Sequence, residues 1–459
     1  MLREYSYFKI LCKLFWEEKL EAYLVGGALR DFFLDKKILD YDIVVKERVA
    51  EMARYFAEII QGKFIIVNEE HKIYRVIARD IIFDFTSIKG DNIREDLSRR
   101  DFTINALALP ICSSDSHSGL PDLQDVIDPF GGLNDLRDKI IRATNERVFR
   151  EDPLRLWRAF RFSAEPGFKI EEKTSELLSK YSLLAGEAAR ERIKEELMKI
   201  LQKSESAKII RDMEEVGLLS SIIPEINEMK QTGENKYHRE DVWAHSLQVL
   251  AVLEEIVDDG RYKKYIAQDQ LPLLKLTALL HDIGKIKSRT VKDGQIHYFG
   301  HEKEGVGILE PILKGLRLSR KEISFVCEVG RLHMRPFHLY TAENLSEKGI
   351  LRFFRQGAAL VPVILIHSLA DKLANMRNNN RSDEVSSYVT FVDGLLTKYG
   401  NYQKRTESLY LNGKEIMTIT GLPEGPLIGK LLNELHFAQG NGEVNSREEA
   451  IAYIKNRSD

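Results

Sequence analysis

The 459-residue sequence has few cysteines and no long apolar run. Cys12, Cys112 and Cys327 stand far apart, so we expect neither a disulfide framework nor a zinc ribbon, and this indicates a reducing cytoplasm. The longest apolar stretch, "AALVPVILI" (358–366), contains a proline and is too short to span a bilayer. The first twenty residues carry charges throughout and lack the apolar core of a signal peptide. We therefore expect a cytoplasmic protein with no membrane partner.

The sequence also lacks a strong charge of one sign. Its 68 Lys and Arg residues nearly balance 71 Asp and Glu residues, for a net charge of −3. A nucleic-acid site would then have to be a local basic patch and not a field over the whole protein. The length suggests about three domains, each able to bury a core.

Strand-like and helix-like patterns divide the chain. The runs "AYLVGG", "DYDIVV", "KFIIVN", "YRVIARD" and "IIFDFTSI" read as strands, whereas the residues after about 140 show helical spacing, as in "VWAHSLQVLAVLEEIV". We predict an α+β fold: a head with a mixed sheet and helices, then a mostly α-helical remainder. The predicted parts are a head at 1–140, a helical neck and body at 141–235, a third domain at 236–385 and a helical tail at 386–459.

Two aspartates lie within one predicted strand, "DYDIVV". Asp40 and Asp42 project from one face of this strand, and Tyr41 and Ile43 from the other. Neighbouring carboxylates repel each other unless a cation lies between them, and Mg²⁺ prefers oxygen ligands and phosphate partners. Such a pair suits phosphoryl transfer with two metal ions. The alternative is that one aspartate caps a turn and the other is solvated on an edge strand.

The residues upstream favour the metal interpretation. Gly26 and Gly27 end a strand before a predicted helix, where backbone N–H groups can approach a triphosphate. Arg30 lies one turn into that helix and can reach the same phosphates. This combination resembles the nucleotidyltransferase superfamily typified by DNA polymerase β. Asp84, on a later strand, is the candidate third carboxylate, or an ordinary edge-strand aspartate.

Three further motifs follow in order: "EDLSRRDFTINALAL" (95–109), "VIDPFGGLNDLRDKIIRAT" (126–144) and "EDPLRLWRAFRF" (151–162). With them the chain resembles, over nearly its whole length, the class II tRNA nucleotidyltransferase and bacterial poly(A) polymerase family. The resemblance implies a polymerase-β-like head followed by neck, body and tail, with Mg²⁺ at the head. It implies tRNA, CTP and ATP as partners, and no DNA. The 3′-hydroxyl of a tRNA would attack the α-phosphate of CTP or ATP, and pyrophosphate would leave.

The resemblance also assigns residues to nucleotide selection. A row on one helix face would pair with the edges of cytosine or adenine in place of a nucleic-acid template: Asp152, Arg155, Arg158 and Arg161. The alternative for this row is a set of intrahelical salt bridges, which contribute little.

The motif "RRDFTINA" supplies the remaining nucleotide-binding candidates. Arg99 or Arg100 would contact the nucleotide's phosphate or ribose, and Asp101 would hold the ribose or an arginine. Asn105 would support the site, unless it only caps a buried turn.

The connection before "RRDFTINA" is short. In the family, enzymes that add C, C and A carry a flexible loop here, and a shortened loop goes with addition of the two cytidines only. CC addition is therefore an alternative to full CCA addition. Poly(A) synthesis is a further one, although arginine-rich extensions are not evident.

A second set of motifs consists of "DVWAHSL", "LLHDIGK" and "IHSLADKLAN", which contain His245, then His281 with Asp282, and Asp371. This set resembles the HD phosphohydrolase superfamily. The predicted ligands of a divalent cation, such as Mg²⁺, Mn²⁺ or Ni²⁺, are His245, His281, Asp282 and Asp371, and a second metal would add His301 and His333. The alternative is that each histidine is a satisfied packing or surface residue, which we predict for His297, His338 and His367. A protein in which only this hydrolase works, beside an inactive RNA-binding head, is the least favoured hypothesis.

The tail contains Gly421, Gly425 and Gly429, which we expect to precede a helix, and Lys430. Backbone N–H groups freed by glycines can meet phosphate there, and the segment resembles the family's tRNA-binding tail. A plain turn between helices is the alternative.

Overall fold

The computed structural model describes residues 2–111, 123–233, 241–293, 295–377 and 382–458. Cys112 lies outside these ranges. The chain forms two compact units, one of residues 1–197 with 212–222 and one of residues 198–211 with 223–459. We describe each unit by itself, and the four-part division expected from the sequence stays a prediction.

The first unit is built on a six-stranded mixed sheet, which confirms the predicted fold class. Its strand order is β3-β4-β5-β2-β1-β6. β2 and β5 run parallel, and the other neighbouring strands run antiparallel. The strands are β1 (Ala22–Val25), β2 (Asp40–Val45), β3 (Lys63–Asn68), β4 (Ile73–Ala78), β5 (Ile81–Ser87) and β6 (Ala108–Pro110).

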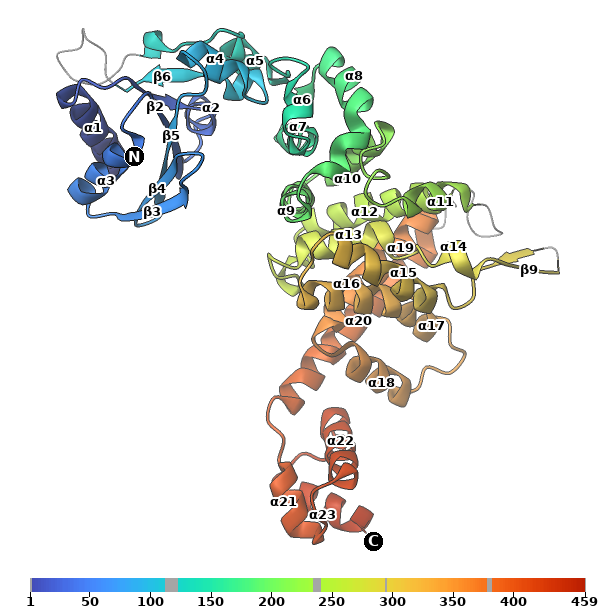
Figure 1. The fold of residues 1–459 in the computed structure, drawn as a ribbon. Coiled ribbons are helices and arrows are strands. Elements are labelled where there is room, and N and C mark those ends of the chain that lie inside the picture. Colours follow the sequence, from blue (N-terminus) through green and yellow to red (C-terminus); the bar gives the residue numbers. More distant parts are fainter. Residues whose placement is uncertain (1, 112–122, 234–240, 294, 378–381, 459) are drawn as a thin grey trace. The chain divides into compact units, whose positions relative to one another are not determined.

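The two faces of this sheet have different partners. On one face Tyr41 stacks on Phe83, and Phe56 of α3 (Val49–Ile60) packs edge-on against Phe83. Helix α1 (Leu2–Glu17) lies beside α3 on this face (Figure 1). On the other face Val44 packs against Leu97 of α4 (Ile93–Ser98). Because side chains alternate along a strand, Asp40 and Asp42 share the face with Val44.

Short helices follow the sheet in the first unit. Pro153 is the N-cap residue directly before α7, where its fixed φ suits the entry into a helix. Trp157 of α7 is fully buried and donates its Nε1–H to Ala185 O at 3.2 Å, so it anchors the surrounding helices. The elements are α2 (Gly27–Phe33), η1 (Thr103–Asn105), η2 (Leu123–Asp125), α5 (Gly132–Asp138), β7 (Ile140–Ile141), α6 (Val148–Glu151), α7 (Leu154–Ser163), β8 (Lys169–Ile170), α8 (Glu172–Tyr181) and η3 (Ser182–Glu187). Two further helices, α9 (Arg190–Leu201) and α10 (Ser206–Glu215), are divided between the two units.

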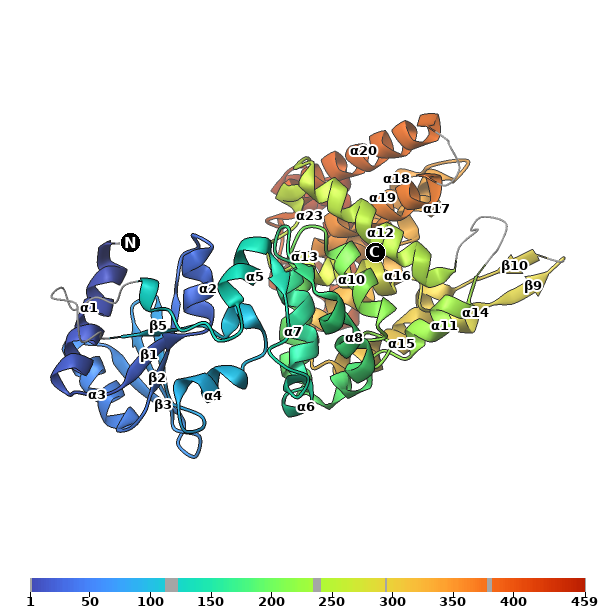
Figure 2. The ribbon, with the colours of Figure 1, turned by 90° about the horizontal axis from the view of Figure 1, so that it is seen from above.

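The described residues of the second unit are mainly helical, with one hairpin, β9 (Thr290–Lys292) with β10 (Gln295–His297), which projects beyond α14 in Figure 2. Helix α13 (Leu271–Leu280) is buried from Pro272 to its end and forms the centre of the unit. The other helices are α11 (Glu225–Gln231), α12 (Val242–Asp258), η4 (Lys263–Tyr265), α14 (Lys285–Ser288), α15 (His301–Gly315), α16 (Arg320–Leu332), α17 (Arg335–Tyr340), α18 (Glu347–Gly357), η5 (Ala358–Leu360), α19 (Val361–Arg377), α20 (Ser382–Thr406), α21 (Gly413–Thr420), α22 (Pro426–Asn441) and α23 (Arg447–Ser458).

One helical stretch, Glu347–Met376, is long and apolar enough to cross a membrane. In this structure 56% of its most apolar window is buried inside the protein. A core helix of a soluble protein passes the same test, so this stretch is weak evidence for a membrane span.

The last three helices form a small core of their own, which includes Leu411, Ile428 and Leu435. Gly421 ends α21 in the left-handed conformation, with φ 70°, and Gly425 precedes α22. Gly429 lies inside α22, so its predicted position before the helix is wrong. Pro426 starts this helix, which is a favoured place for proline.

Candidate functional site

A cavity of about 780 Å³ opens in the first unit. Nearly all of the predicted nucleotide-site residues line it together. They are Gly26, Gly27, Arg30, Asp40, Asp42, Asp84, Arg100, Asp101, Asn105, Asp152, Arg155, Arg158 and Arg161.

The three aspartates come from adjacent parallel strands. Asp40 and Asp42 lie on β2, and Asp84 on β5 stands directly opposite Asp42 in the strand register. Burial raises the pKa of Asp42, Asp84 and Asp40 raise it further, and Arg100 opposes the rise. Since three carboxylates in one cavity repel one another, the arrangement fits a divalent cation bound among oxygen ligands.

Gly26 is required by close packing at the cavity wall. Its φ is 70°, and a Cβ there would lie 2.7 Å from Arg100 Nη1 and 3.1 Å from Asp42 Oδ2. Its N–H donates to Leu107 O at 3.3 Å. A side chain at this position would therefore displace a guanidinium and a carboxylate of the cavity.

A line of hydrogen bonds connects the residues of "RRDFTINA" to Arg30. Arg30 Nη1 donates to Asn105 Oδ1 at 2.7 Å, and Asn105 Nδ2 donates to Asp101 Oδ1 at 2.9 Å. Arg158 Nε donates to Asp101 Oδ2 at 2.7 Å. Burial alone would raise the pKa of Asp101, but Arg158 and the bonds from Asn105 and the Phe102 N–H outweigh it and lower that pKa. Asn105 thus joins an arginine to an aspartate, which is more than a turn cap.

The arginine row of α7 makes its hydrogen bonds to other elements. Arg158 pairs with Asp101, and Arg161 Nε donates to Glu196 Oε2 at 2.5 Å. Arg155 Nη2 donates to the backbone oxygen of Arg99 at 2.7 Å. Arg155 Nη1 also lies 3.9 Å from a carboxylate oxygen of Glu151, which ends α6 and does not belong to α7. The row is therefore not a set of intrahelical salt bridges.

Arg99 and Arg100 are placed differently. Arg100 lines the cavity of the aspartates, and its Nη2 lies 3.1 Å from Asp96 Oδ2. Arg99 instead lines a second cavity of about 750 Å³ together with Arg147 and Arg150. Of the two candidates, the structure thus brings Arg100 to the nucleotide-site residues.

Sequence reasoning missed several partners of the site, among them Arg75 and Glu196. Arg75 of β4 lines the cavity and holds Asp84, with Nε 2.7 Å from Oδ1 and Nη2 2.8 Å from Oδ2. Glu196 of α9 holds Arg161. The alternation of "YRVIA" signals that Arg75 faces away from Tyr74 and Val76, which are buried, but only the strand pairing shows which residue it meets.

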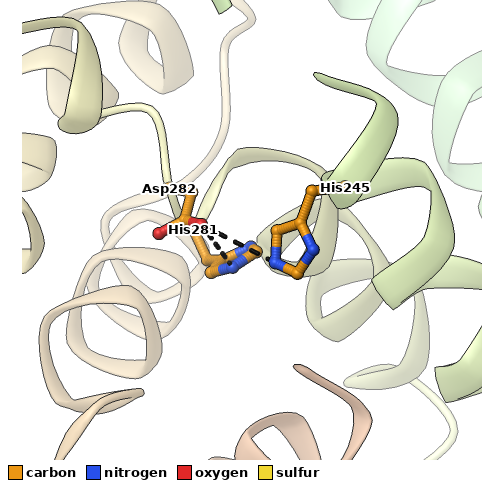
Figure 3. A group of neighbouring side chains, drawn as sticks. All are labelled: His245, His281 and Asp282. Atoms are coloured by element: carbon orange, nitrogen blue, oxygen red, sulfur yellow. Dashed lines mark ion pairs between the residues drawn. The ribbon is translucent and has the colours of Figure 1, made fainter. Parts of the chain in front are cut away.

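In the second unit, helices bring together a buried group of histidines and carboxylates. His245 of α12, His281 and Asp282 form one cluster, shown in Figure 3. Asp282 Oδ2 lies 3.7 Å from His245 Nε2 and 3.3 Å from His281 Nε2. Asp371 of α19 adds its Oδ1 at 3.0 Å from His245 Nε2.

A second group shares Asp282. Its Oδ1 lies 3.1 Å from His301 Nε2 and 3.8 Å from His333 Nε2. The Nε2 atoms of His301 and His333 are 3.3 Å apart. Burial and the neighbouring histidines lower the pKa of His333 to about 3, so this imidazole is neutral at ordinary pH.

The hydrogen bonds of three of these rings suit metal binding. Each ring places its Nδ1 against the backbone oxygen three residues earlier: His281 at Ala278, His301 at Tyr298 and His333 at Gly330. If Nδ1 carries the proton and donates it to this backbone oxygen, Nε2 offers a lone pair to a metal ion. The hydrogen bond then fixes the tautomer and the orientation of the ring. Two lone pairs facing each other at 3.3 Å repel unless a cation lies between them. These residues therefore fit divalent metal ions.

His367 departs from its prediction. It is buried, as a packing residue should be, and its ring centroid lies 5.0 Å from that of His281. Neither ring nitrogen has a hydrogen-bond partner among the described residues, so it is not a satisfied histidine. His367 precedes Asp371 by four residues on α19, so the two residues lie on one face of the helix. This spacing is the sequence signal that could have placed His367 beside the cluster. His297 stacks on Phe299, and His338 is exposed.

Three family models match the chain in order. They are described as "Poly A polymerase head domain" for residues 22–142, "Probable RNA and SrmB- binding site of polymerase A" for residues 167–230, and "HD domain" for residues 242–376.

Curated relatives match over nearly the whole length. An A-adding tRNA nucleotidyltransferase of Deinococcus radiodurans is 30% identical over 95% of both chains. A CC-adding tRNA nucleotidyltransferase of Thermus thermophilus is 29% identical over 95% of this chain and 93% of its own. Among solved structures, a Thermotoga maritima CCA-adding enzyme in complex with tRNA has a TM-score of 0.66 at 22% identity, covering 98% of this chain and 95% of its own. That structural likeness supports the fold.

Proposed function

The chain belongs to the tRNA nucleotidyltransferase family, and from this premise we propose that it extends the 3′ end of tRNA with CTP or ATP, without a nucleic-acid template. The observation that carries the proposal is the single cavity in which three aspartates meet the arginine row of α7. Metal ligands and base-pairing groups are then within reach of one nucleotide.

The carboxylates of Asp40, Asp42 and Asp84 would hold Mg²⁺, which neutralises the triphosphate and activates the attacking hydroxyl when bound. The 3′-hydroxyl oxygen of the tRNA forms a bond to the α-phosphorus. The bond to the bridging oxygen breaks, and pyrophosphate leaves. Arg30 and Arg100, on the cavity wall, would bind phosphate or ribose oxygens.

Base selection is proposed for Asp152, Arg155, Arg158 and Arg161. A carboxylate accepts hydrogen bonds from an exocyclic amino group, and a guanidinium donates to ring nitrogen or carbonyl oxygen. The contacts of Arg158 with Asp101 and of Arg161 with Glu196 would hold these forks in position before the nucleotide enters.

The nucleotides incorporated identify the product. A tRNA lacking its 3′ CCA, and one ending in CC, are each incubated with CTP, with ATP and with both. Two cytidines on the first tRNA mean CC addition, which the compact connection through α4 supports. One adenosine on the second tRNA means A addition, and CCA on the first means both. A long adenosine tail would replace the proposal with poly(A) synthesis, and no incorporation would overturn it.

We further propose a metal-dependent phosphohydrolase in the second unit, supported by the shared carboxylate of Asp282 and the imidazoles around it. A divalent cation such as Mg²⁺, Mn²⁺ or Ni²⁺ would activate water against a phosphate ester. The test is metal content together with hydrolysis of a generic aryl phosphodiester and phosphomonoester. Loss of both metal and hydrolysis in Asp282→Asn supports the site, and unchanged metal content contradicts it.

Tail binding to tRNA and a cytoplasmic location stay predictions. Footprinting of tRNA with and without the residues after Thr406 would test the first. Protection of the tRNA that depends on the tail supports it, and an identical footprint without the tail contradicts it.

A further inference from the structure

Arg75 takes part in none of the steps above, yet it holds one of the proposed metal ligands. We propose that its guanidinium is the built-in counter-ion of Asp84: it occupies this carboxylate while no divalent cation is bound, and a cation gains full access to Asp84 by displacing it. Arg75 is thus a positioning residue that weakens the binding of bare metal. This inference rests on the proposed function of the head.

The geometry is a two-point grip. Arg75 Nε and Nη2 reach different oxygens of Asp84, at 2.7 and 2.8 Å. The two residues stand directly opposite each other on the antiparallel strands β4 and β5, so the backbone fixes their approach. A forked contact of this kind is stronger and more directional than a single charged hydrogen bond.

The position of this pair separates it from an ordinary cross-strand salt bridge. Its side chains are 37% and 23% exposed, and an isolated surface pair of this kind contributes little to stability. Here, however, Asp84 also stands opposite Asp42 on its other side, and all three residues line one cavity with Asp40. The acceptor of Arg75 is therefore a carboxylate aimed at a proposed metal site.

The charges lead to the same conclusion. The carboxylates of Asp40, Asp42 and Asp84 come from neighbouring positions of β2 and β5 in the cavity wall. Arg75 pairs with Asp84, and Arg100 lies with Asp42 against Gly26. A cation that binds Asp84 must compete with a guanidinium already on both oxygens. When a metal ion arrives bound to a triphosphate, the triphosphate supplies negative charge that Arg75 can then contact.

The test is Mn²⁺ binding, measured from the free Mn²⁺ signal in electron paramagnetic resonance. All variants carry Asp282→Asn, which removes the shared ligand of the histidine cluster in the second unit. Mn²⁺ binding that is lost on adding Asp42→Asn is assigned to the aspartates of the first unit. Arg75→Met keeps the aliphatic stem and removes the charge. We expect it to bind Mn²⁺ about tenfold more tightly without nucleotide, because the cation no longer competes with a guanidinium for the two oxygens of Asp84. Arg75→Lys keeps the charge but not the forked contact, so its Mn²⁺ affinity should lie between those of the Arg75 protein and Arg75→Met.

A double-mutant cycle decides whether Arg75 acts through Asp84. In an Asp84→Asn background, Arg75→Met should change Mn²⁺ affinity less than twofold. If Arg75→Met raised Mn²⁺ affinity tenfold in the Asp84→Asn background too, its effect would be a general one of charge. If it did not raise Mn²⁺ affinity when Asp84 is present, the pair would be structural only. Either result overturns the inference. If Asp42→Asn leaves Mn²⁺ binding unchanged, the proposed metal site itself fails, which is a separate outcome. Thermal unfolding of each variant checks that it is folded.

Discussion

Asp101 is the residue on which the hydrogen bonds of the nucleotide cavity converge. It is buried, and it accepts from Asn105, from Arg158 and from the N–H of Phe102. These donors make its ionised form the stable one in the folded state, in spite of its burial. The cavity wall therefore depends on a charge that acid can remove.

The first prediction is a pH dependence. The pKa of Asp101 is lowered from its ordinary value of 3.8, so its stabilising contribution is present above pH 3.8 and is lost as the pH falls through the lower folded-state value. Asp101→Asn should lower the free energy of unfolding at pH 7. The difference between wild type and variant should become smaller below pH 4. Urea unfolding followed by the fluorescence of buried Trp157 would measure it. A difference that stays constant with pH would contradict the assignment.

His367 gives a second prediction at this scale. Two buried ring nitrogens without partners among the described residues should cost stability. In the presence of EDTA, His367→Leu should raise the unfolding temperature by a few degrees, since a leucine of similar volume needs no hydrogen bond. The matched control is Ser246→Ala, which removes a buried hydroxyl that likewise has no hydrogen-bond partner in the described part of the chain. A lower unfolding temperature for His367→Leu would show that the ring is satisfied.

At the scale of elements, one buried ion pair fastens helices of the second unit. Glu254 of α12 accepts from Lys275 of α13 at 2.7 Å and from the backbone N–H groups of Ser206 and Ala207, at the start of α10. The glutamate thereby caps a helix that it does not belong to. Lys275 in turn donates to Lys203 O at 2.6 Å.

The third prediction concerns this cap. Glu254→Ala leaves the buried Lys275 without its carboxylate and should cost about 3–5 kcal/mol. The joint replacement of Glu254 and Lys275 by methionine should cost less than Glu254→Ala, because no charge is left unpaired. Hydrogen exchange at the first amides of α10 reports on the cap directly. If these amides stayed protected from exchange in Glu254→Ala, Glu254 would not be the cap of α10.

The elements also show how far the sequence can predict this structure. The alternation in "DYDIVV" predicts that Asp40 and Asp42 share a face, because a strand's period is local. The pairing of β2 with β5, which brings Asp84 opposite Asp42, involves residues 42 positions apart and has no local signal. Glu196 was missed for the same reason, since it lies 35 positions from Arg161. Arg75 was missed because the alternation of a strand does not give its register with the neighbouring strand. Gly429 was misplaced because glycine is tolerated inside a helix as well as before one.

At the scale of the whole molecule, the two proposed active sites lie in different compact units. The aspartate cavity is made of residues of the first unit, and the histidine cluster of residues of the second. Since no side chain is shared, the two chemistries should be separable by single substitutions. The sequence motifs predict this separation, because each set lies within its own continuous stretch of chain.

The central claim is that the carboxylates of the head carry out nucleotide addition. The most direct test compares wild type, Asp42→Asn and Asp282→Asn for CTP and ATP incorporation into tRNA lacking its 3′ end, with phosphodiester hydrolysis measured on the same preparations. We expect Asp42→Asn to lose incorporation by about a thousandfold, the effect of several kcal/mol of lost metal stabilisation, and to keep hydrolysis, and Asp282→Asn to do the reverse. Incorporation by folded Asp42→Asn at the wild-type rate would contradict the account.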